Sequence, residues 1–187
     1  MEHFHNNIQG WTDDDLFFVY KEAVEQNQSG AHFIEVGSWK GKSAAYMCVE
    51  IINSGKVINF DCVDPWLGTS DEEHGFDEDY KNKTLFEAFT NNMKPVEGHY
   101  KAVRLPSVEA AKLYEDESLD FVFIDGNHDY DNVKADILAW LPKLKKGKLL
   151  AGHDWGVAEG VRRAATEIFK DDIRVTGSNI CWSHIKK

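Results

Sequence analysis

The stretch LDFVFIDGNHDY, residues 119–130, decides the fold, because a nearly apolar run ends abruptly in polar residues. Three further stretches have the same form: HFIEVGSWKGKS (32–43), VINFDCVDPW (57–66) and KLLAGHDW (148–155). Short apolar runs of this kind are typical of strands that are buried on both faces. Helical patterns separate them, and this alternation predicts an α/β fold with a Rossmann-like, doubly wound, mostly parallel sheet of seven strands.

The expected elements follow from apolar spacing and from turn residues. Strands are expected at 31–36, 56–63, 100–105, 121–124 and 148–151, before an antiparallel C-terminal hairpin of 173–176 and 180–185. A first helix is expected from Thr12, as its N-cap, to Gly30, and others over 43–52, 85–89, 107–114, 133–144 and 157–168.

Length and composition favour one soluble domain over residues 1–187, in which residues 1–11 are expected to form a mobile N-terminal tail. The net charge of −11 disfavours nucleic-acid binding, which needs a concentrated basic surface. No apolar run approaches the roughly 20 residues of a membrane span, and no signal peptide is recognisable. Three cysteines without a Cys-x-x-Cys pair fit a reducing compartment, so we expect a cytoplasmic protein without membrane contact.

Polar residues follow the strands at one predicted edge of the sheet. Because parallel strands end at a shared edge, where ligands bind, these residues should converge although about 120 residues separate them. The set comprises Gly37, Gly41, Asp64, Asp125, His128, His153 and Asp154. The pattern predicts a cofactor site next to a polar reaction centre.

The turn after the first strand is the candidate cofactor loop. Gly37 and Gly41 permit positive φ and close backbone approach, and Ser38 and Ser43 add hydroxyls. The spacing is G-x-x-x-G and not the dinucleotide pattern G-x-G-x-x-G. Glu35, at the strand end, would repel a pyrophosphate and suits a cationic amino group.

Three residues beyond this loop are candidates for the rest of the cofactor. Asp64 follows the second strand and can accept hydrogen bonds from ribose hydroxyls. Trp66 can stack on an adenine face, or it is a core side chain. Ser107 can contact the base, or it caps the helix that it begins.

Asp125, His128, His153 and Asp154 form the expected reaction centre. His128 is the candidate general base, because imidazole titrates near neutrality. The carboxylates Asp125 and Asp154, with His153, could hold a divalent metal; magnesium prefers oxygen ligands, and manganese, iron or zinc accept histidine better. Consecutive residues of a regular strand point oppositely, so of the last two we expect Asp154 to be the ligand.

The acidic, aperiodic stretch 67–82 is expected to be a loop near the active site, as a lid or substrate wall, or else a surface insertion. Its acidic side chains disfavour an anionic substrate. The first helix, with Phe17, Phe18 and Tyr20, could offer a homodimer contact.

The motifs resemble those of class I S-adenosylmethionine-dependent methyltransferases, in the small-molecule branch with macrocin-type sugar O-methyltransferases and cephalosporin-hydroxylase-like proteins. The resemblance rests on FIEVGSWKGKS, on VDPW and on the block from LDFVFIDGNHDY to AGHDW, and it covers about residues 12–185. It implies that Glu35 and Gly37 face the methionine part, Asp64 the ribose, and Trp66 and Ser107 the adenine. The family also places metal ligands at the positions of Asp125, His153 and Asp154.

Two positions depart from this family pattern. Lys148 replaces a glycine before the fifth strand, and Trp39 stands where many methyltransferases have a second glycine. The first reading is therefore an O-methyltransferase that uses S-adenosylmethionine, and magnesium or manganese, on a small-molecule acceptor such as a sugar or secondary metabolite. An NAD-dependent oxidoreductase and a non-catalytic S-adenosylmethionine-binding protein are the alternatives.

Overall fold

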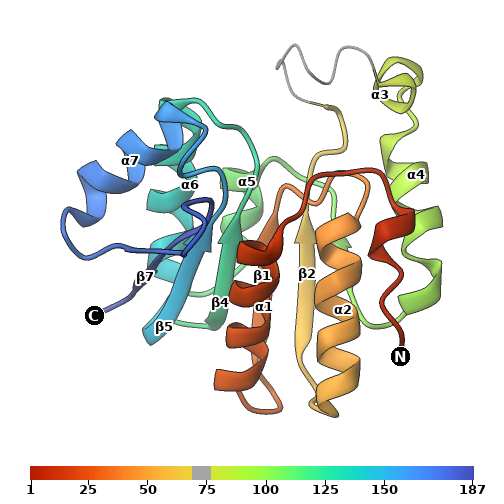
Figure 1. Ribbon diagram of the computed structural model, residues 1–187, viewed down its shortest axis with the longest axis horizontal. Coiled ribbons are helices and arrows are strands. Elements are labelled where there is room, and N and C mark those ends of the chain that lie inside the picture. Colours follow the sequence, from red (N-terminus) through yellow and green to blue (C-terminus); the bar gives the residue numbers. More distant parts are fainter. Residues whose placement is uncertain (69–76) are drawn as a thin grey trace.

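Seven strands form one central sheet in the computed structural model, which describes residues 1–68 and 77–187 (Figure 1). The strands are β1 His32–Val36, β2 Asn59–Val63, β3 Lys101–Val103, β4 Leu119–Ile124, β5 Leu144–Gly152, β6 Arg174–Val175 and β7 Trp182–Ile185. Their order is β3-β2-β1-β4-β5-β7-β6, and β7 is antiparallel to both neighbours. The predicted fold class, with its closing hairpin, is confirmed.

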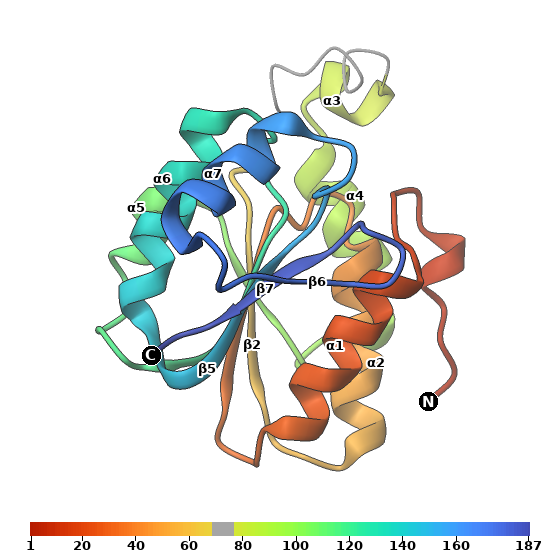
Figure 2. The same ribbon diagram turned by 60° about the vertical axis from the view of Figure 1, so that its left-hand side comes forward.

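Helices cover both faces of the sheet (Figures 1 and 2). They are α1 Asp14–Gln26, α2 Lys42–Ser54, α3 Glu78–Asn82, α4 Leu85–Asn92, α5 Ser107–Ala111, α6 Tyr130–Trp140 and α7 Glu159–Phe169. One core lies between the sheet and α1, α2 and α4, and a second lies between the sheet and α5, α6 and α7.

Strand β4 shows why the sheet sits between two cores. All six of its residues are buried. Phe121 and Phe123 point into the α1–α2 core, and Val122 and Ile124 point into the α6–α7 core. Alternate residues of β4 therefore pack into two different apolar cores, so neither face of this strand needs polar side chains.

Several predicted helix boundaries were wrong, including the end of the first helix, which lies at Gln26 and not at Gly30. The N-cap of α1 is Asp13, whose carboxylate accepts a hydrogen bond from the Leu16 amide at 2.9 Å, and not Thr12. Helix α3 lies within the stretch expected to be a loop, and Asp77 caps it through the Tyr80 amide. Residues 69–76 of that stretch lie outside the described residues.

The first residues of the chain pack on α2, so the expectation of a mobile tail was wrong. The His3 ring stacks on Tyr46 with centroids 4.4 Å apart, and His5 meets the same ring edge-on. On α1, Tyr20 is fully buried and Phe17 stacks on Tyr46, which leaves Phe18 exposed. The aromatic face on which the homodimer expectation rested is thus largely internal.

Within residues 1–68 and 77–187, no helix is long and apolar enough to cross a membrane.

Replacement of Phe121 by alanine tests the α1–α2 core. Phe121 is fully buried and its ring contacts Phe33 at 5.3 Å between centroids. We expect the free energy of unfolding to fall by about 3–5 kcal/mol in urea denaturation, because a cavity remains. The control Leu138→Ala, on the exposed side of α6, should change it by less than about 0.5 kcal/mol. Equal effects of the two changes would contradict this assignment of the core.

Candidate active site

The carboxyl ends of β1, β2, β4 and β5 meet at one edge of the sheet, which is the upper edge in Figure 1. Backbone hydrogen bonds join the segments just beyond these ends. The Gly37 amide donates to the Val63 carbonyl at 2.9 Å, and the Asp125 amide donates to the Val36 carbonyl at 2.8 Å. The His153 amide likewise donates to Ile124 at 3.2 Å. The structure thus brings the predicted polar residues to one edge.

The turn from Gly37 to Gly41 connects β1 to α2. Gly37 has φ +91°, and a Cβ there would lie 1.9 Å from the Asp125 carbonyl oxygen. Gly41 has φ +88° at the N-cap of α2, where a Cβ would meet the Met93 side chain at 3.0 Å. Both glycines are required by contacts within the protein, whereas the sequence argument assigned them to the approach of a ligand.

Glu35 is a buried carboxyl group beside this turn, with 1% of its surface exposed. The Tyr20 hydroxyl donates to Glu35 Oε2 at 2.5 Å, and Oε1 has no hydrogen-bond partner. The Ser38 and Ser43 hydroxyls lie close enough to favour the charged carboxylate, but they do not complete a hydrogen bond to Oε1. Burial outweighs these effects and raises the pKa of Glu35 to about 7. Ser38 Oγ is also buried without a hydrogen-bond partner.

Asp64 holds the turn from the end of β2. Its carboxylate accepts hydrogen bonds from the backbone amides of Trp39 at 2.9 Å and Trp66 at 2.6 Å. A carboxylate oxygen can accept more than one hydrogen bond, so this contact is compatible with ribose binding. The structure therefore adds a structural role for Asp64 to the predicted one.

The two residues expected at the adenine end are engaged by the protein. Trp66 is 2% exposed, its ring packs against Phe89, and its Nε1 donates to the Trp39 carbonyl. Ser107 Oγ accepts a hydrogen bond from Trp140 Nε1 at 2.9 Å. The structural reading of Trp66, as a core side chain, fits this geometry, and stacking on adenine does not.

Asp125, His128 and Asp154 form a polar cluster whose ligand atoms all lie within 4.8 Å of one another. His128 Nε2 lies 3.0 Å from Asp154 Oδ2 and 4.0 Å from Asp125 Oδ1. Burial and repulsion from Asp154 raise the pKa of Asp125. The pKa of Asp154 is lowered, because His128 and His153 outweigh its own burial. Two carboxyl groups with opposite pKa shifts at one place make this cluster the candidate reaction centre.

His153 is buried beside this cluster, with 7% of its surface exposed. Its Nε2 is 2.7 Å from Asp13 Oδ2, and its Nδ1 is 3.2 Å from Asp154 Oδ1. Burial disfavours the charged ring, but Asp125, Asp13 and Asp154 outweigh it and raise the pKa of His153 to about 11. Both ring nitrogens of His153 therefore face carboxylates of the protein.

Two features of this cluster were missed. β5 ends at Gly152 and Asp154 has φ +61°, so strand alternation does not separate His153 from Asp154. Asp13 was missed because only the tertiary fold brings it to a residue 140 positions away. The one sequence signal was its place among the acids that begin α1.

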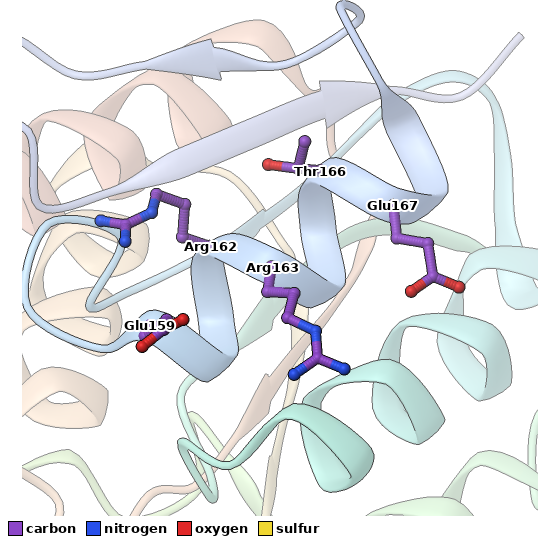
Figure 3. Close-up of a pocket in the computed structure, with 5 residues that line it drawn as sticks. All are labelled: Glu159, Arg162, Arg163, Thr166 and Glu167. Carbon is purple, nitrogen blue, oxygen red and sulfur yellow. The ribbon is translucent and has the colours of Figure 1, made fainter.

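A separate surface depression follows α7 and does not include any predicted site residue. Its lining comprises Glu159, Arg162, Arg163, Thr166 and Glu167 (Figure 3). The Arg163 guanidinium lies 3.9 Å from the Tyr130 ring centroid, which ties α7 to α6. This depression is a helix surface, and it lies apart from the polar cluster at the sheet edge.

The pKa of Glu35 gives a stability test. Between the ordinary value of 4.5 and about 7 the folded state keeps a proton that the unfolded chain has lost. Stability from this group is therefore full below about pH 4.5 and is lost as pH rises through 7. Relative to Glu35→Gln, we expect wild-type unfolding free energy to fall by roughly 3 kcal/mol at most from pH 5 to 8.

Urea denaturation of both proteins at four pH values measures this difference, and Glu115→Gln, an exposed position, controls for the loss of one carboxylate. Parallel pH curves for wild type and Glu35→Gln would show that Glu35 titrates normally.

Comparison with known proteins agrees with this geometry. Residues 34–155 match the family described as methyltransferase domain. An uncharacterized protein of Sinorhizobium fredii, y4gI, is 31% identical over 126 residues, which are 67% of this chain and 13% of that protein. The chain thus spans about an eighth of that relative.

Solved structures share the fold at low identity. The O-methyltransferase NovP has a TM-score of 0.70 at 14% identity, covering 91% of this chain and 79% of its own. An O-methyltransferase from Bacillus cereus, in complex with SAH, has a TM-score of 0.61 at 14% identity, covering 95% and 83%. A precorrin-6y C5,15-methyltransferase from Geobacter metallireducens has a TM-score of 0.66 at 13% identity, covering 97% and 95%. The family match covers the turn at β1 and the Asp125 cluster alike, and the chain belongs to the methyltransferase-domain family.

Proposed function

We propose that this chain transfers a methyl group from S-adenosylmethionine to a hydroxyl of a small molecule, with a divalent metal beside the acceptor. The observation that carries the proposal is the contact between the two halves of the site. Gly37, in the cofactor turn, packs on the backbone of Asp125, in the reaction centre. Methyl donor and acceptor must meet, and this contact puts their binding residues next to each other.

The cofactor half fits a cationic amino acid moiety. Glu35 presents an unpartnered carboxylate oxygen at the turn, and Ser38 presents an unpartnered hydroxyl. An α-ammonium group would pair with Glu35 and shift it to its charged form. Gly41 is the N-cap of α2 and Ser43 lies in its first turn, and we assign Asp64, which accepts from the Trp39 amide, to the ribose. A pyrophosphate would meet a carboxylate here, which disfavours NAD.

The reaction centre supplies a base. S-adenosylmethionine brings a methyl group on a sulfonium, whose S–C bond breaks as the acceptor oxygen forms the O–C bond. The acceptor hydroxyl must lose its proton, and we assign that proton to His128, whose side chain is 39% exposed at the mouth of the site. The Asp154 carboxylate, 3.0 Å from His128 Nε2, stabilises the imidazolium that results.

Asp125 and Asp154 are the residues that would hold the metal. Two carboxylates suit Mg²⁺ or Mn²⁺. A cation bound there would lower the pKa of the acceptor hydroxyl. The carboxylates at this edge also disfavour an anionic acceptor, and a neutral sugar or secondary metabolite fits better.

Calorimetry tests the cofactor assignment. We expect S-adenosylmethionine and S-adenosylhomocysteine to bind with micromolar affinity, and Glu35→Ala to weaken both by about tenfold or more. NAD should give no heat. Tight NAD binding without a response to S-adenosylmethionine would support the oxidoreductase alternative and overturn the proposal.

Two variants separate the base from the metal ligands. We expect His128→Ala to lower methyl transfer by about 10²–10⁴-fold while the affinities for Mn²⁺ and S-adenosylmethionine stay unchanged. Asp154→Asn should weaken Mn²⁺ binding by about tenfold or more. Release of S-adenosylhomocysteine over a panel of hydroxylated acceptors measures transfer, and calorimetry measures binding. Loss of Mn²⁺ binding in His128→Ala would make His128 a ligand, and cofactor binding without turnover on any acceptor would favour the non-catalytic alternative.

A further inference from the structure

Lys40, in the turn from Gly37 to Gly41, carries a buried ammonium group. Its side chain is 5% exposed. Its Nζ lies 2.7 Å from Asp77 Oδ2, 2.6 Å from Asp79 Oδ2 and 2.9 Å from Gln9 Oε1. An ammonium group has three N–H donors, and these acceptors use all of them. The side chain therefore joins three segments of the chain and has no donor left for a cofactor.

Stability alone does not explain this arrangement. A buried ion pair seldom stabilises a fold more than apolar side chains of similar volume would, and such pairs often fix one conformation among several. Asp77 is itself buried, with 7% of its side chain exposed, and it caps α3. Lys40 thereby fixes the start of α3 against the turn.

The turn itself is held in an unfavourable backbone conformation. Trp39 has φ +41°, which a residue with a side chain adopts at a cost. Such strain persists where hydrogen bonds fix the backbone before and after the strained residue. The Trp39 amide binds Asp64, the Trp39 carbonyl binds Trp66, and the Lys40 carbonyl accepts from Asn92 Nδ2 at 2.9 Å. Lys40 connects this turn to the start of α3 through its ion pairs with Asp77 and Asp79.

We propose that Lys40 is a positioning residue for the cofactor, holding the Gly37–Gly41 turn against Asp77 and Asp79 in the shape that binds S-adenosylmethionine. The inference rests on the proposed function. Lys40 acts through the turn: with its ammonium group bound, Ser38 and the backbone at Gly37 keep their place next to Glu35. Without it, the buried Asp77 carboxylate repels Asp79, and the turn loses its attachment to α3.

The test compares Lys40→Met with Lys145→Met. Lys145 also lies 2.7 Å from a buried carboxylate, that of Asp120, at the opposite edge of the sheet, but its side chain is 41% exposed. We expect Lys40→Met to weaken S-adenosylhomocysteine binding by about tenfold or more in calorimetry, and Lys145→Met to change it less than about twofold. The double variant Lys40→Met/Asp77→Asn should bind no more weakly than Lys40→Met, because both changes break one contact. Thermal denaturation of each variant accompanies the binding data.

The outcomes are distinguishable. If wild type binds and Lys40→Met binds equally well, the role of Lys40 is structural and this inference is overturned, while the proposed function stands. If wild type gives no heat, the proposed function fails and the inference fails with it. If Lys40→Met does not fold, Asp79→Asn decides: this carboxylate is 37% exposed, and we expect about threefold weaker binding. Unchanged affinity in Asp79→Asn would then overturn the inference.

Discussion

The close approach between Gly37 and the Asp125 backbone is the constraint on which the rest of the site depends. The Asp125 amide donates to Val36, and the Asp125 carbonyl occupies the space that any side chain at position 37 would need. Parallel pairing of β1 with β4 brings the two segments together, because both strands end at the same level. The Gly37–Gly41 turn and the polar cluster are therefore packed against each other, although they lie far apart in the sequence.

Charge distribution follows from this packing. The site gathers four carboxyl groups, Glu35, Asp125, Asp154 and Asp13, on the carboxyl edge of the sheet. The buried His153 lies between three of them and offsets part of their repulsion. Glu35 accepts a hydrogen bond from the Tyr20 hydroxyl and has no cationic side chain among its hydrogen-bond partners in the described residues. A cationic donor and a metal cation would each complete one half of this edge.

Much of this could be predicted from the sequence. Apolar runs such as residues 119–124 specify buried strands by length and composition, and the alternation with helices specifies the sheet. The convergence of Asp64, Asp125 and Asp154 followed from topology alone. Roles that depend on side-chain neighbours could not be predicted. The sequence is the same whether a tryptophan after a strand stacks on a ligand or packs against a core side chain, as Trp66 packs against Phe89. Helix α3 was hidden by an acidic composition that resembles a loop, because Asp77 is its N-cap and Asp79 pairs with Lys40.

Amide hydrogen exchange with and without S-adenosylhomocysteine tests the central claim most directly, because it locates the ligand on the fold. The account predicts slower exchange at residues 35–41 and 61–66, at the carboxyl ends of β1 and β2, and no change at residues 144–149, at the opposite edge. Protection confined to α7, around the depression of Figure 3, or spread evenly over both edges, would contradict a cofactor site at the Gly37–Gly41 turn.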